Sequence, residues 1–440
     1  MDLGERSIAV IGSGVSGLTA SYVLSATNRV TLFEADTRIG GHAHTHYLDR
    51  GDGNIVGVDS AFLVHNDRTY PTLCRLFSEL GITTQESDMS MSVRAHQSGL
   101  EYAGARGIGG LFPAWSNLAR PRYLAMLAEV LRFHKAANRV LDSEATADID
   151  EQETLGAFLD RQGFSPYFTE YFMTPLVAAV WSCAPGEAMR YPARYLFVFL
   201  QHHGMLSVFG SPTWRTVTGG SAHYVAAILK RVAEFAVGAP VSSVRRVADG
   251  VQVAVGPPGN PAAPRTFDAA VIATHPEQAL LMLEEPTTAE RAVLGAIQYS
   301  TNEALLHTDE NVLPRRHRAR ASWNYLITPN RDNVLVTYDV TRLMRLSGTK
   351  RFLVTLGGRD VVDPATVLAE MTYDHPLYTT ESIAAQRLLP TLGDERLVFA
   401  GAYHGWGFHE DGAASGLTAA RRLGADWARA SGKQVQALAC

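Results

Sequence analysis

Cysteine, long apolar runs and excess positive charge are all scarce in this sequence. The chain has three cysteines, Cys74, Cys183 and Cys440, and none forms a CxxC pair, so we expect a reducing compartment and no disulfide framework. No apolar run approaches the roughly 20 residues that a membrane-spanning helix needs. The net charge of −5 argues against nucleic acid as a partner, because nucleic-acid binding calls for a basic surface.

The rest of the composition is that of an ordinary globular protein. Hydrophobic residues make up 46% of the 440 residues, and charged residues make up 19%. A chain of this length exceeds the size at which one hydrophobic core usually stops growing, so we expect two domains. The first apolar run begins at Ile8, which leaves no space for a signal peptide, and we therefore expect a cytoplasmic protein.

The most informative stretch is SIAVIGSGVSGLTASYVLSATNRVTLFE, residues 7–34. It predicts a strand, a glycine-rich turn, a helix and a second strand. Gly12 permits the tight turn, Gly14 lets the backbone approach a pyrophosphate, and Gly17 lets the helix pack closely on the strand. The N–H groups at the start of the helix, at Val15 and Ser16, are free to hold the phosphates. This stretch predicts a dinucleotide-binding site.

A second glycine pair follows the acid that ends the second strand. That acid, Glu34, is expected to accept hydrogen bonds from the ribose hydroxyls. The sequence EADTRIGGH, residues 34–42, resembles the E-x-x-x-R-x-G-G-R element of the flavoproteins that include monoamine oxidase, phytoene desaturase and protoporphyrinogen oxidase. The resemblance implies FAD as cofactor, with contacts from Glu34, Ala35, Arg38, Gly40, Gly41 and His42. His42 stands where these proteins usually have arginine.

Longer motifs point to a narrower group of proteins. They are DSAFLVHN (59–66), DMSMSV (88–93), EYAG (101–104), PLVAAVWSCAP (175–185), PTWRTVTGGSAHYV (212–225) and AGAYHGWGFHEDGAASGL (400–417). Together they resemble bacterial amine-oxidase-like flavoproteins whose genes commonly accompany cyclopropane-fatty-acyl-phospholipid-synthase-like methyltransferases. The resemblance covers nearly the whole chain and implies a functional link to such a methyltransferase.

The resemblance also implies an architecture. The fold is expected to be α/β, with a Rossmann-like FAD-binding domain and a discontinuous α+β substrate domain. The expected ranges are 1–70, 210–290 and 390–440 for the FAD-binding domain, and 71–209 and 291–389 for the substrate domain. Further cofactor contacts are implied at Val241, Ala273, Gly401, Ala402, Gly412 and Ala413. Ala402 occupies a position where an acid that binds the ribityl hydroxyls is usual.

Catalytic residues are harder to assign from the sequence. His404 and Trp406 follow the strand that is expected to end beneath the flavin, so we predict that they line its substrate side. Other histidines that could accept a proton are His202, His203 and His409. An apolar pocket is expected from the aromatic residues Trp181, Tyr195, Phe197, Tyr325, Tyr403 and Trp406.

Three histidines, His42, His44 and His46, stand at alternate positions. On a strand they would share one face, which is a plausible spacing for metal ligands. They directly follow the phosphate-binding elements, however, and no other cluster of ligands is obvious nearby. We therefore expect no metal site.

The segment 107–140 pairs leucines at helical spacing with positive charge. Six basic residues stand in or beside it, against the single acid Glu129: Arg106, Arg120, Arg122, Arg132, Lys135 and Arg139. A basic amphipathic helix can lie on an anionic membrane. The alternative is a solvated helix that caps the substrate domain, and both interpretations stay open. The first implies peripheral contact with the inner face of the membrane.

Three functions remain as hypotheses. The first is an FAD-dependent oxidoreductase that oxidises or desaturates a lipid or fatty acyl chain by hydride transfer to flavin N5. The second is a flavin amine oxidase, in which an aromatic cage would suit a neutral amine. The third is a lipid-binding protein of the same fold without redox chemistry, which the intact Glu34 and the glycine pair disfavour.

Overall fold

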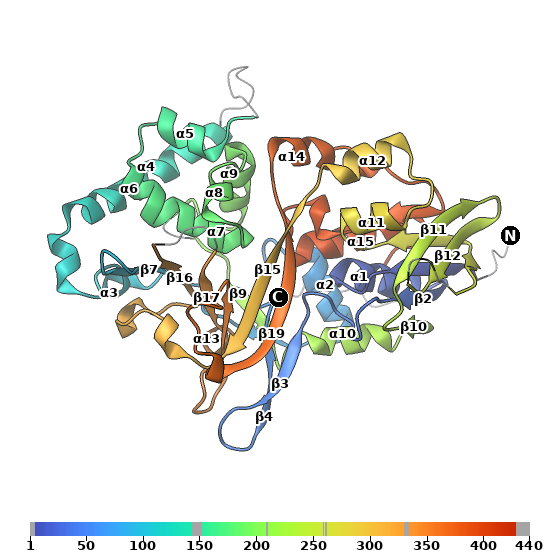
Figure 1. Cartoon of the computed structure of the whole chain (residues 1–440), viewed down its shortest axis with the longest axis horizontal. Coiled ribbons are helices and arrows are strands. Elements are labelled where there is room, and N and C mark those ends of the chain that lie inside the picture. Colours follow the sequence, from blue (N-terminus) through green and yellow to red (C-terminus); the bar gives the residue numbers. More distant parts are fainter. Residues whose placement is uncertain are drawn as a thin grey trace.

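The computed structural model describes residues 5–142, 152–207, 210–257, 259, 262–329 and 334–427. Its elements form two lobes, and two long strands, β15 (Tyr299–His307) and β19 (Val367–Pro376), run between them (Figure 1). The lobe at the right of Figure 1 holds the predicted nucleotide-binding unit, and the lobe at the left carries helices α3 to α9. Cys74 and Cys183 are buried and form no disulfide, and Cys440 lies outside the described residues.

The right-hand lobe is built on a five-stranded parallel sheet with the order β10-β2-β1-β14-β20. Its strands are short, continuous apolar runs because both faces of the sheet are covered. Ile8 and Val10 of β1 face one core, and Ala9 and Ile11 face the other. The bounds are β1 (Ser7–Ile11), β2 (Arg29–Phe33), β10 (Glu234–Ala236), β14 (Ala269–Ile272) and β20 (Leu397–Phe399).

Helices cover one face of this sheet, and a smaller sheet covers the other. The first layer consists of α1 (Val15–Leu24), α2 (Pro71–Leu80), α10 (Ala222–Leu229) and α15 (His409–Arg422). The second consists of the antiparallel strands β11 (Val241–Val247), β12 (Gly250–Val255) and β13 (Arg265–Phe267), with α11 (Pro276–Met282), α12 (Thr288–Gly295) and α14 (Thr380–Gln386). All ten residues of α1 are buried, since the helix packs on the sheet and against α10 and α15.

Residues 71–86, which the predicted ranges place in the substrate domain, pack on the nucleotide-binding side. Leu73, Leu76 and Phe77 of α2 share a core with Val10 and Leu32. Strand β6 (Thr84–Glu86) pairs with β9 (Trp214–Val217), which also pairs with β5 (His65–Asn66). The substrate lobe proper therefore begins near β7.

The left-hand lobe holds a seven-stranded sheet with the order β19-β15-β18-β17-β16-β7-β8. Two of its strands come from the earlier segment and five from the later one, so the predicted discontinuous α+β lobe is confirmed. The bounds of the strands not yet given are β7 (Met91–Ala95), β8 (Leu100–Gly104), β16 (Trp323–Ile327), β17 (Val336–Asp339) and β18 (Leu353–Leu356).

A layer of helices covers this sheet. Its members are α3 (Gly107–Leu111), α4 (Pro121–Asp142), α5 (Leu155–Arg161), α6 (Pro166–Phe168), α7 (Thr174–Trp181), α8 (Pro185–Ala188) and α9 (Ala193–His202). Short 3₁₀ turns lie at η1 (Trp115–Ala119) and η4 (His317–Ala319), and a π-helical turn joins α6 to α7. Phe133, Phe158 and Phe197 meet in the centre of this layer.

Helix α4 packs one face on the core and leaves the other in solvent. Tyr123, Met126, Phe133 and Ala137 are its buried residues, and they recur at helical spacing. Leu124 and Leu131 are exposed. Within the part of the chain that the structure describes, no helix is long and apolar enough to cross a membrane.

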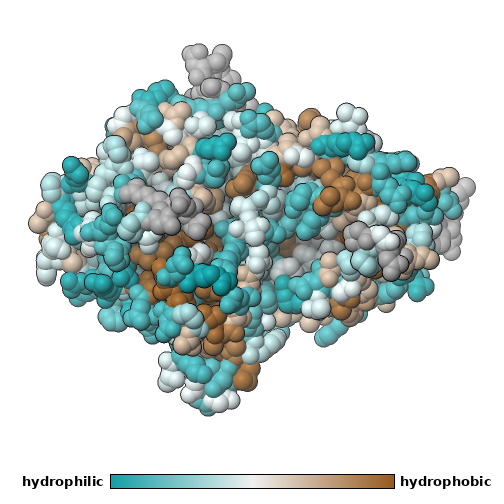
Figure 2. Space-filling model, in the orientation of Figure 1, coloured by the Kyte–Doolittle hydropathy of each residue, from teal (hydrophilic) through white to brown (hydrophobic). Residues whose placement is uncertain are grey.

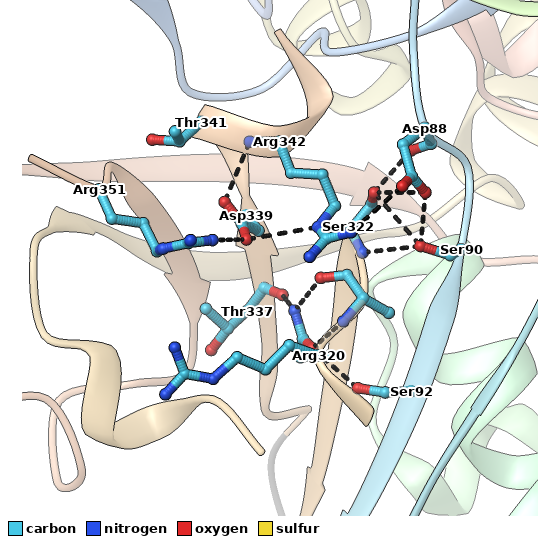
Figure 3. Close-up of polar contacts among 12 residues, drawn as sticks. Asp88, Ser90, Ser92, Arg320, Ser322, Thr337, Asp339, Thr341, Arg342 and Arg351 are labelled. Atoms are coloured by element: carbon cyan, nitrogen blue, oxygen red, sulfur yellow. Dashed lines mark hydrogen bonds and ion pairs between the residues drawn. The ribbon is translucent and has the colours of Figure 1, made fainter. Parts of the chain in front are cut away.

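A buried polar network fixes the sheet of the left lobe where β7, β16 and β17 meet (Figure 3). The carboxylate of Asp339, at the end of β17, is fully buried and pairs with Arg351. It also caps the first turn of α13 (Val340–Leu343) by accepting the backbone N–H of Arg342 (3.1 Å). Arg342 also donates to Asp88 (3.2 Å), whose carboxylate accepts the Ser90 hydroxyl (2.7 Å). Removing one partner of such a network leaves a buried charge unpaired, which is strongly destabilising.

Candidate functional site

A cavity of about 620 Å³ lies between the two lobes. One half is formed by the β1–α1 turn and by residues that follow β2, β14 and β20. In an open parallel sheet, ligands bind outside the carboxyl ends of the strands. The other half is lined by residues of the substrate lobe, which contributes α7, α9 and the ends of β15 and β19.

The β1–α1 turn shows why three glycines are needed. At Gly12 φ is +96°, and an added Cβ would lie 2.8 Å from the carbonyl oxygen of Ala273. At Gly17 a Cβ would overlap the carbonyl oxygen of Gly12, so only glycine lets α1 pack this closely on β1. At Gly14, by contrast, a Cβ would meet nothing within 4 Å, and the residue lines the cavity. The turn therefore leaves room for a phosphate group beside the start of α1.

Glu34 lines the cavity at the end of β2. Its carboxylate accepts the Ser13 N–H (2.9 Å), the Ser13 hydroxyl and the Asp36 N–H (2.9 Å). These bonds hold the side chain at the mouth of the turn. Ala35, Val241 and Ala273 line the same part of the cavity, which therefore offers the acid and the apolar walls that an adenosine needs.

Arg38 does not line the cavity. Its guanidinium donates to the carbonyl oxygens of Gly41 (2.8 Å) and Ala43 (3.0 Å), and so fixes the loop that carries the second glycine pair. Gly41 lies against Gly14, and His42 follows it into the cavity. The His42 ring lies 5.0 Å from that of Tyr373 and 5.3 Å from that of His375, and burial lowers its pKa well below the usual value.

The last strand and helix close the nucleotide half. The Gly401 N–H, just after β20, donates to the Ser415 hydroxyl (3.0 Å) of α15. A Cβ at Gly412 would lie 2.5 Å from Val15, so this glycine lets α15 approach the start of α1.

The predicted cofactor contacts fall into two sets. Those that line the cavity are Gly12, Gly14, Val15, Ser16, Glu34, Ala35, Gly41, His42, Val241, Ala273, Gly401 and Ala402. Those that lie behind the lining are Gly17, Arg38, Gly40, Gly412 and Ala413, and these shape the elements that carry the first set.

The substrate half of the cavity is mainly apolar and aromatic. Of the aromatic residues predicted for it, Trp181, Tyr403 and Trp406 line it, whereas Tyr195, Phe197 and Tyr325 lie in the surrounding core. The Trp181 indole donates to the Trp406 carbonyl (3.2 Å), which fixes the two walls together. Sequence reasoning missed further lining residues: Leu63, Val64, Phe199, Met205, Trp214, Trp323, Tyr338, Leu356 and Phe408.

Several histidines face the cavity in neutral form. Burial lowers the pKa of His375 to about 4 and that of His409 to about 3, and the His409 ring stacks on Phe62 at 3.7 Å. Burial likewise lowers the pKa of His203 to about 4. His404, predicted at the substrate side, is not among the lining residues, although burial lowers its pKa to about 4 as well.

A chain of hydrogen bonds leads from the cavity to the hairpin of β3 (Thr45–Asp49) and β4 (Ile55–Asp59). The Tyr373 and Ser60 hydroxyls are 2.7 Å apart, and the Ser60 hydroxyl lies 3.0 Å from His46 Nε2. His44 Nδ1 lies 2.9 Å from the Tyr373 hydroxyl. His44 and His46 thus meet hydroxyl groups, and the described residues contain no cluster that could hold a metal.

A second cavity of about 540 Å³ adjoins the first behind Trp406 and Phe408. His202, Glu410 and Asp411 line it. Burial raises the pKa of Asp411 to about 7, although its carboxylate accepts the Phe408 N–H (2.9 Å).

The parallel sheet, the open turn at Gly14 and the acid at Glu34 define a dinucleotide-binding protein with a separate substrate lobe. The profile of the family described as flavin containing amine oxidoreductase matches residues 15–424, and the chain belongs to that family, so its cofactor is FAD. The residues of the nucleotide half fit this cofactor. Members of the family are enzymes.

Individual proteins resemble the chain less closely. An L-amino-acid oxidase of Pseudechis australis is 38% identical over 85 residues, which are 19% of this chain and 16% of that protein. The chain therefore matches only about a sixth of that relative's length. The structure of cyclohexylamine oxidase from Brevibacterium oxydans IH-35A superposes with a TM-score of 0.68 at 17% identity, over 95% of this chain and 98% of that one. A CLA-producing fatty acid isomerase from P. acnes superposes with a TM-score of 0.66 at 14% identity, over 94% and 98%.

Proposed function

We propose that the protein is an FAD-dependent oxidoreductase that oxidises or desaturates a lipid or fatty acyl chain. The observation that carries this proposal is the lining of the substrate half, where leucine, valine, methionine, tryptophan and phenylalanine side chains predominate. An apolar substrate gains free energy from leaving water for such a lining, whereas a charged substrate loses its hydration without a partner.

The carboxylates at the cavity support the same conclusion. Among the described lining residues only Glu34 and Asp374 are acidic. Glu34 is engaged at the nucleotide end, and Asp374 accepts the Thr301 hydroxyl (2.7 Å). Asp374 is therefore the one carboxylate of the described lining outside the nucleotide end, and no cluster of carboxylates is present there to bind an ammonium group.

When bound, FAD supplies an acceptor for the two electrons of a C–H bond. The protein's residues orient the chain and exclude water. Trp181 and Trp406 are held together by their hydrogen bond, and the rings of Phe199 and Phe408 stack at 5.0 Å beside them. We assign Trp406 to the substrate wall on this basis. His404, which shared its predicted role, has no such contact with the cavity.

The chain from Tyr373 through Ser60 to His46 offers a route for the proton that oxidation at carbon releases. Burial raises the pKa of Tyr373 to about 12, so its hydroxyl stays protonated and can pass a proton on only as it receives one. Ser60 can relay that proton to His46 Nε2, which can accept it in the neutral ring that the lowered pKa of buried His46 maintains. Ser60→Ala should interrupt this route and slow flavin reduction without removing FAD.

An amine oxidase is the second candidate. Tyr403 and Trp406 line the cavity and offer aromatic walls for an amine, and the buried His375 beside them is neutral. Cyclohexylamine oxidase is among the proteins that share the fold.

Two lines of support favour the lipid. The fatty acid isomerase that shares the fold acts on fatty acids. The motifs resemble flavoproteins whose genes accompany cyclopropane-synthase-like methyltransferases, so we propose an acyl chain near a methyl branch or double bond as substrate and a functional link to such a methyltransferase.

The test is anaerobic reduction of the bound flavin by candidate substrates. The reduction is measured as the loss of the flavin's visible absorption. Unsaturated and methyl-branched fatty acids should reduce it, and cyclohexylamine and putrescine should not. Reduction by the amines alone would overturn the lipid proposal in favour of the second candidate. Comparison of the lipids of a strain lacking the gene with those of its parent would then identify the acyl chain.

A further inference from the structure

Two stretches far apart in the sequence are strongly basic. Residues 102–128 and 311–329 contain no aspartate or glutamate, although the whole chain has a net charge of −5. Their arginines are Arg106, Arg120, Arg122, Arg315, Arg316, Arg318 and Arg320. The second stretch was not distinguished by sequence analysis.

The fold brings these stretches together at one end of the left lobe. Helix α3 packs against the turn η4, and Figure 1 places α3 near the left end of the molecule. The backbone N–H groups of Arg315 and Arg316 donate to the Glu101 carboxylate (2.8 and 2.9 Å) in β8, just before α3. The Asn117 side chain ties η1 to the same place by donating to the Glu101 carbonyl (2.9 Å).

Large apolar side chains are exposed at this end. Trp115 is 86% exposed, Ile108 80% and Leu118 48%. Isolated apolar residues on a surface need no explanation, but three within one short α3–η1 segment beside arginines do. Tryptophan in particular favours the boundary between water and lipid, where its ring is apolar and its N–H remains hydrated.

Some of the arginines are occupied within the protein. Arg106 pairs with Asp88 (3.3 Å), Arg320 pairs with Glu310 (2.6 Å), and Arg120 donates to the Ser98 carbonyl (3.0 Å). In the described part of the chain, the side chains of Arg122, Arg315, Arg316 and Arg318 have no ion pair, and all four residues are exposed. These four are therefore available to an external anion.

Ion pairs and hydrogen bonds anchor the base of this surface. Asp88, which holds Arg106, also accepts from Arg342 in the network of Figure 3. The segment that carries the apolar side chains is therefore tied to the sheet at Arg106, which lowers the cost of ordering it when it meets a partner.

We propose that this end of the molecule docks on the surface of an anionic phospholipid bilayer. The docking surface consists of Ile108, Trp115, Leu118, Arg122, Arg315, Arg316 and Arg318. The arginines pair with lipid phosphates, and the apolar side chains enter the interface between headgroups and acyl chains. A nucleic acid would match the arginines but would leave Ile108 and Leu118 in water.

The docking surface overlaps only the first part of the segment 107–140 that the sequence suggested, and it leaves out the rest of α4 beyond Arg122. Arg132 on α4 donates to the Gly163 carbonyl (2.9 Å) and lies 4.0 Å above the Phe164 ring, so its guanidinium already has partners in the protein although it is exposed. A second exposed apolar pair, Tyr47 and Ile55, lies on the projecting β3–β4 hairpin, near the hydrophobic region below left of centre in Figure 2. There Asp49 faces Lys350 and Arg50 pairs with Asp52, so the charges are balanced and do not select an anionic surface.

This inference goes beyond the proposed function, because it depends on surface charge and apolar exposure and not on flavin chemistry. It holds for any substrate. With a lipid substrate it adds that the enzyme meets the acyl chain at the bilayer surface.

The experiment is co-sedimentation of the holoprotein with vesicles of phosphatidylcholine alone or mixed with phosphatidylglycerol. The wild type should bind the mixed vesicles at low salt and dissociate from them when salt is added. It should not bind the vesicles of phosphatidylcholine alone. Each basic residue near an anionic surface strengthens binding about fivefold, so R315Q/R316Q/R318Q should weaken it about a hundredfold. The matched control R29Q/K230Q/R291Q removes three exposed cations of the other lobe and should change binding less than twofold.

The apolar contribution is tested with I108S/W115S, which should lower binding at least tenfold while flavin content and melting temperature stay unchanged. The proposal would be overturned if the wild type did not bind anionic vesicles at low salt. It would also be overturned if the control R29Q/K230Q/R291Q lost as much vesicle binding as R315Q/R316Q/R318Q. Binding of wild type and I108S/W115S to a short RNA with equal affinity, without vesicle binding, would also overturn it in favour of a polyanion. Flavin reduction by soluble fatty acid is scored separately, so failure of docking and failure of the proposed function are distinguishable.

Discussion

Glycine is needed in the β1–α1 turn for two different reasons. Gly14 leaves space for a ligand, and Gly17 lets the helix pack closely on the turn. The backbone of Gly14 (φ −63°, ψ 175°) suits any residue, and an added Cβ meets no protein atom within 4 Å. We therefore expect the Gly14→Ala apoprotein to be as stable as the wild type, or up to about 1 kcal/mol more stable, because alanine restricts the unfolded chain. The same methyl group projects into the space that the turn leaves for the pyrophosphate.

The cost to FAD binding follows from the hydrogen bonds that are lost. A charge-assisted bond between a backbone N–H and a phosphate is worth about 1.5–3 kcal/mol. If a methyl group displaces the pyrophosphate from about two such donors, affinity falls by about 3–6 kcal/mol, or about two to four orders of magnitude in Kd. Gly14→Val, with a larger side chain, should yield protein without flavin.

Gly17→Ala is the matched comparison. Its Cβ would overlap the Gly12 carbonyl oxygen and lie 3.3 Å from the Ala273 side chain, so α1 must move away from β1. Overpacking of this kind costs about 1–3 kcal/mol, and here it should appear in the apoprotein as well.

Two assays separate these effects. Urea unfolding of the apoproteins measures stability, and titration with FAD measures affinity through the quenching of flavin fluorescence. Gly14→Ala should lose affinity at unchanged stability, and Gly17→Ala should lose both. Wild-type FAD affinity in Gly14→Ala would refute the assignment of the turn to the pyrophosphate. Destabilisation of Gly14→Ala to the level of Gly17→Ala would refute the argument from open space.

Three further predictions concern single side chains. Glu34→Ala should weaken FAD binding by about 1.5–3 kcal/mol, and an unchanged Kd would mean that the ribose is held elsewhere. Burial raises the pKa of Asp411 to about 7, above its unfolded value, so the folded state binds the proton more tightly and the free energy of unfolding falls as pH rises from about 4 to about 7. Asp411→Asn should not show this fall. If the free energy of urea unfolding changes between pH 5 and pH 8 by the same amount in the wild type and in Asp411→Asn, the prediction is contradicted. Trp406→Ala should slow anaerobic flavin reduction by about ten- to hundredfold with little change in the Kd of FAD, and reduction at the wild-type rate would remove Trp406 from the substrate wall.

The nucleotide half of the protein could be predicted because its signals are local. Strands buried on both faces appear as continuous apolar runs, and the glycines of the turn follow within a few residues of β1. Arg38 marks the limit of such reasoning. A motif places it near the phosphates, but only the folded loop reveals that its guanidinium is bonded to the Gly41 and Ala43 carbonyls.

The substrate half could not be predicted to the same depth. Met205, Trp323 and Tyr338 come from separate segments, and nothing in their local sequence distinguishes a cavity wall from ordinary core. Phe197 illustrates the converse, because it was expected at the pocket and instead packs on Phe158 at 4.8 Å. Whether an aromatic side chain meets a cavity depends on how distant elements pack, which periodicity does not encode.

The docking surface could be predicted only in part from the sequence, for a related reason. The segment 107–140 drew attention because its charges and leucines are contiguous. The run of arginines at 315–318 lies about 200 residues later and becomes significant only when η4 packs against α3.

The β15–β19 pair limits how substrate specificity could be exchanged between relatives of this protein. The strands belong to the sheet of the left lobe, yet Tyr299, Tyr373 and His375 at their ends line the cavity. A chimera that exchanged only the helices α4 to α9 would therefore keep Tyr299, Tyr373 and His375 of the original cavity wall. Because the two strands pair along their whole length, from Tyr299 opposite Pro376 to His307 opposite Val367, they would have to be transplanted together. The workable cutting points lie outside this ribbon, in the connections that precede β15 and follow β19.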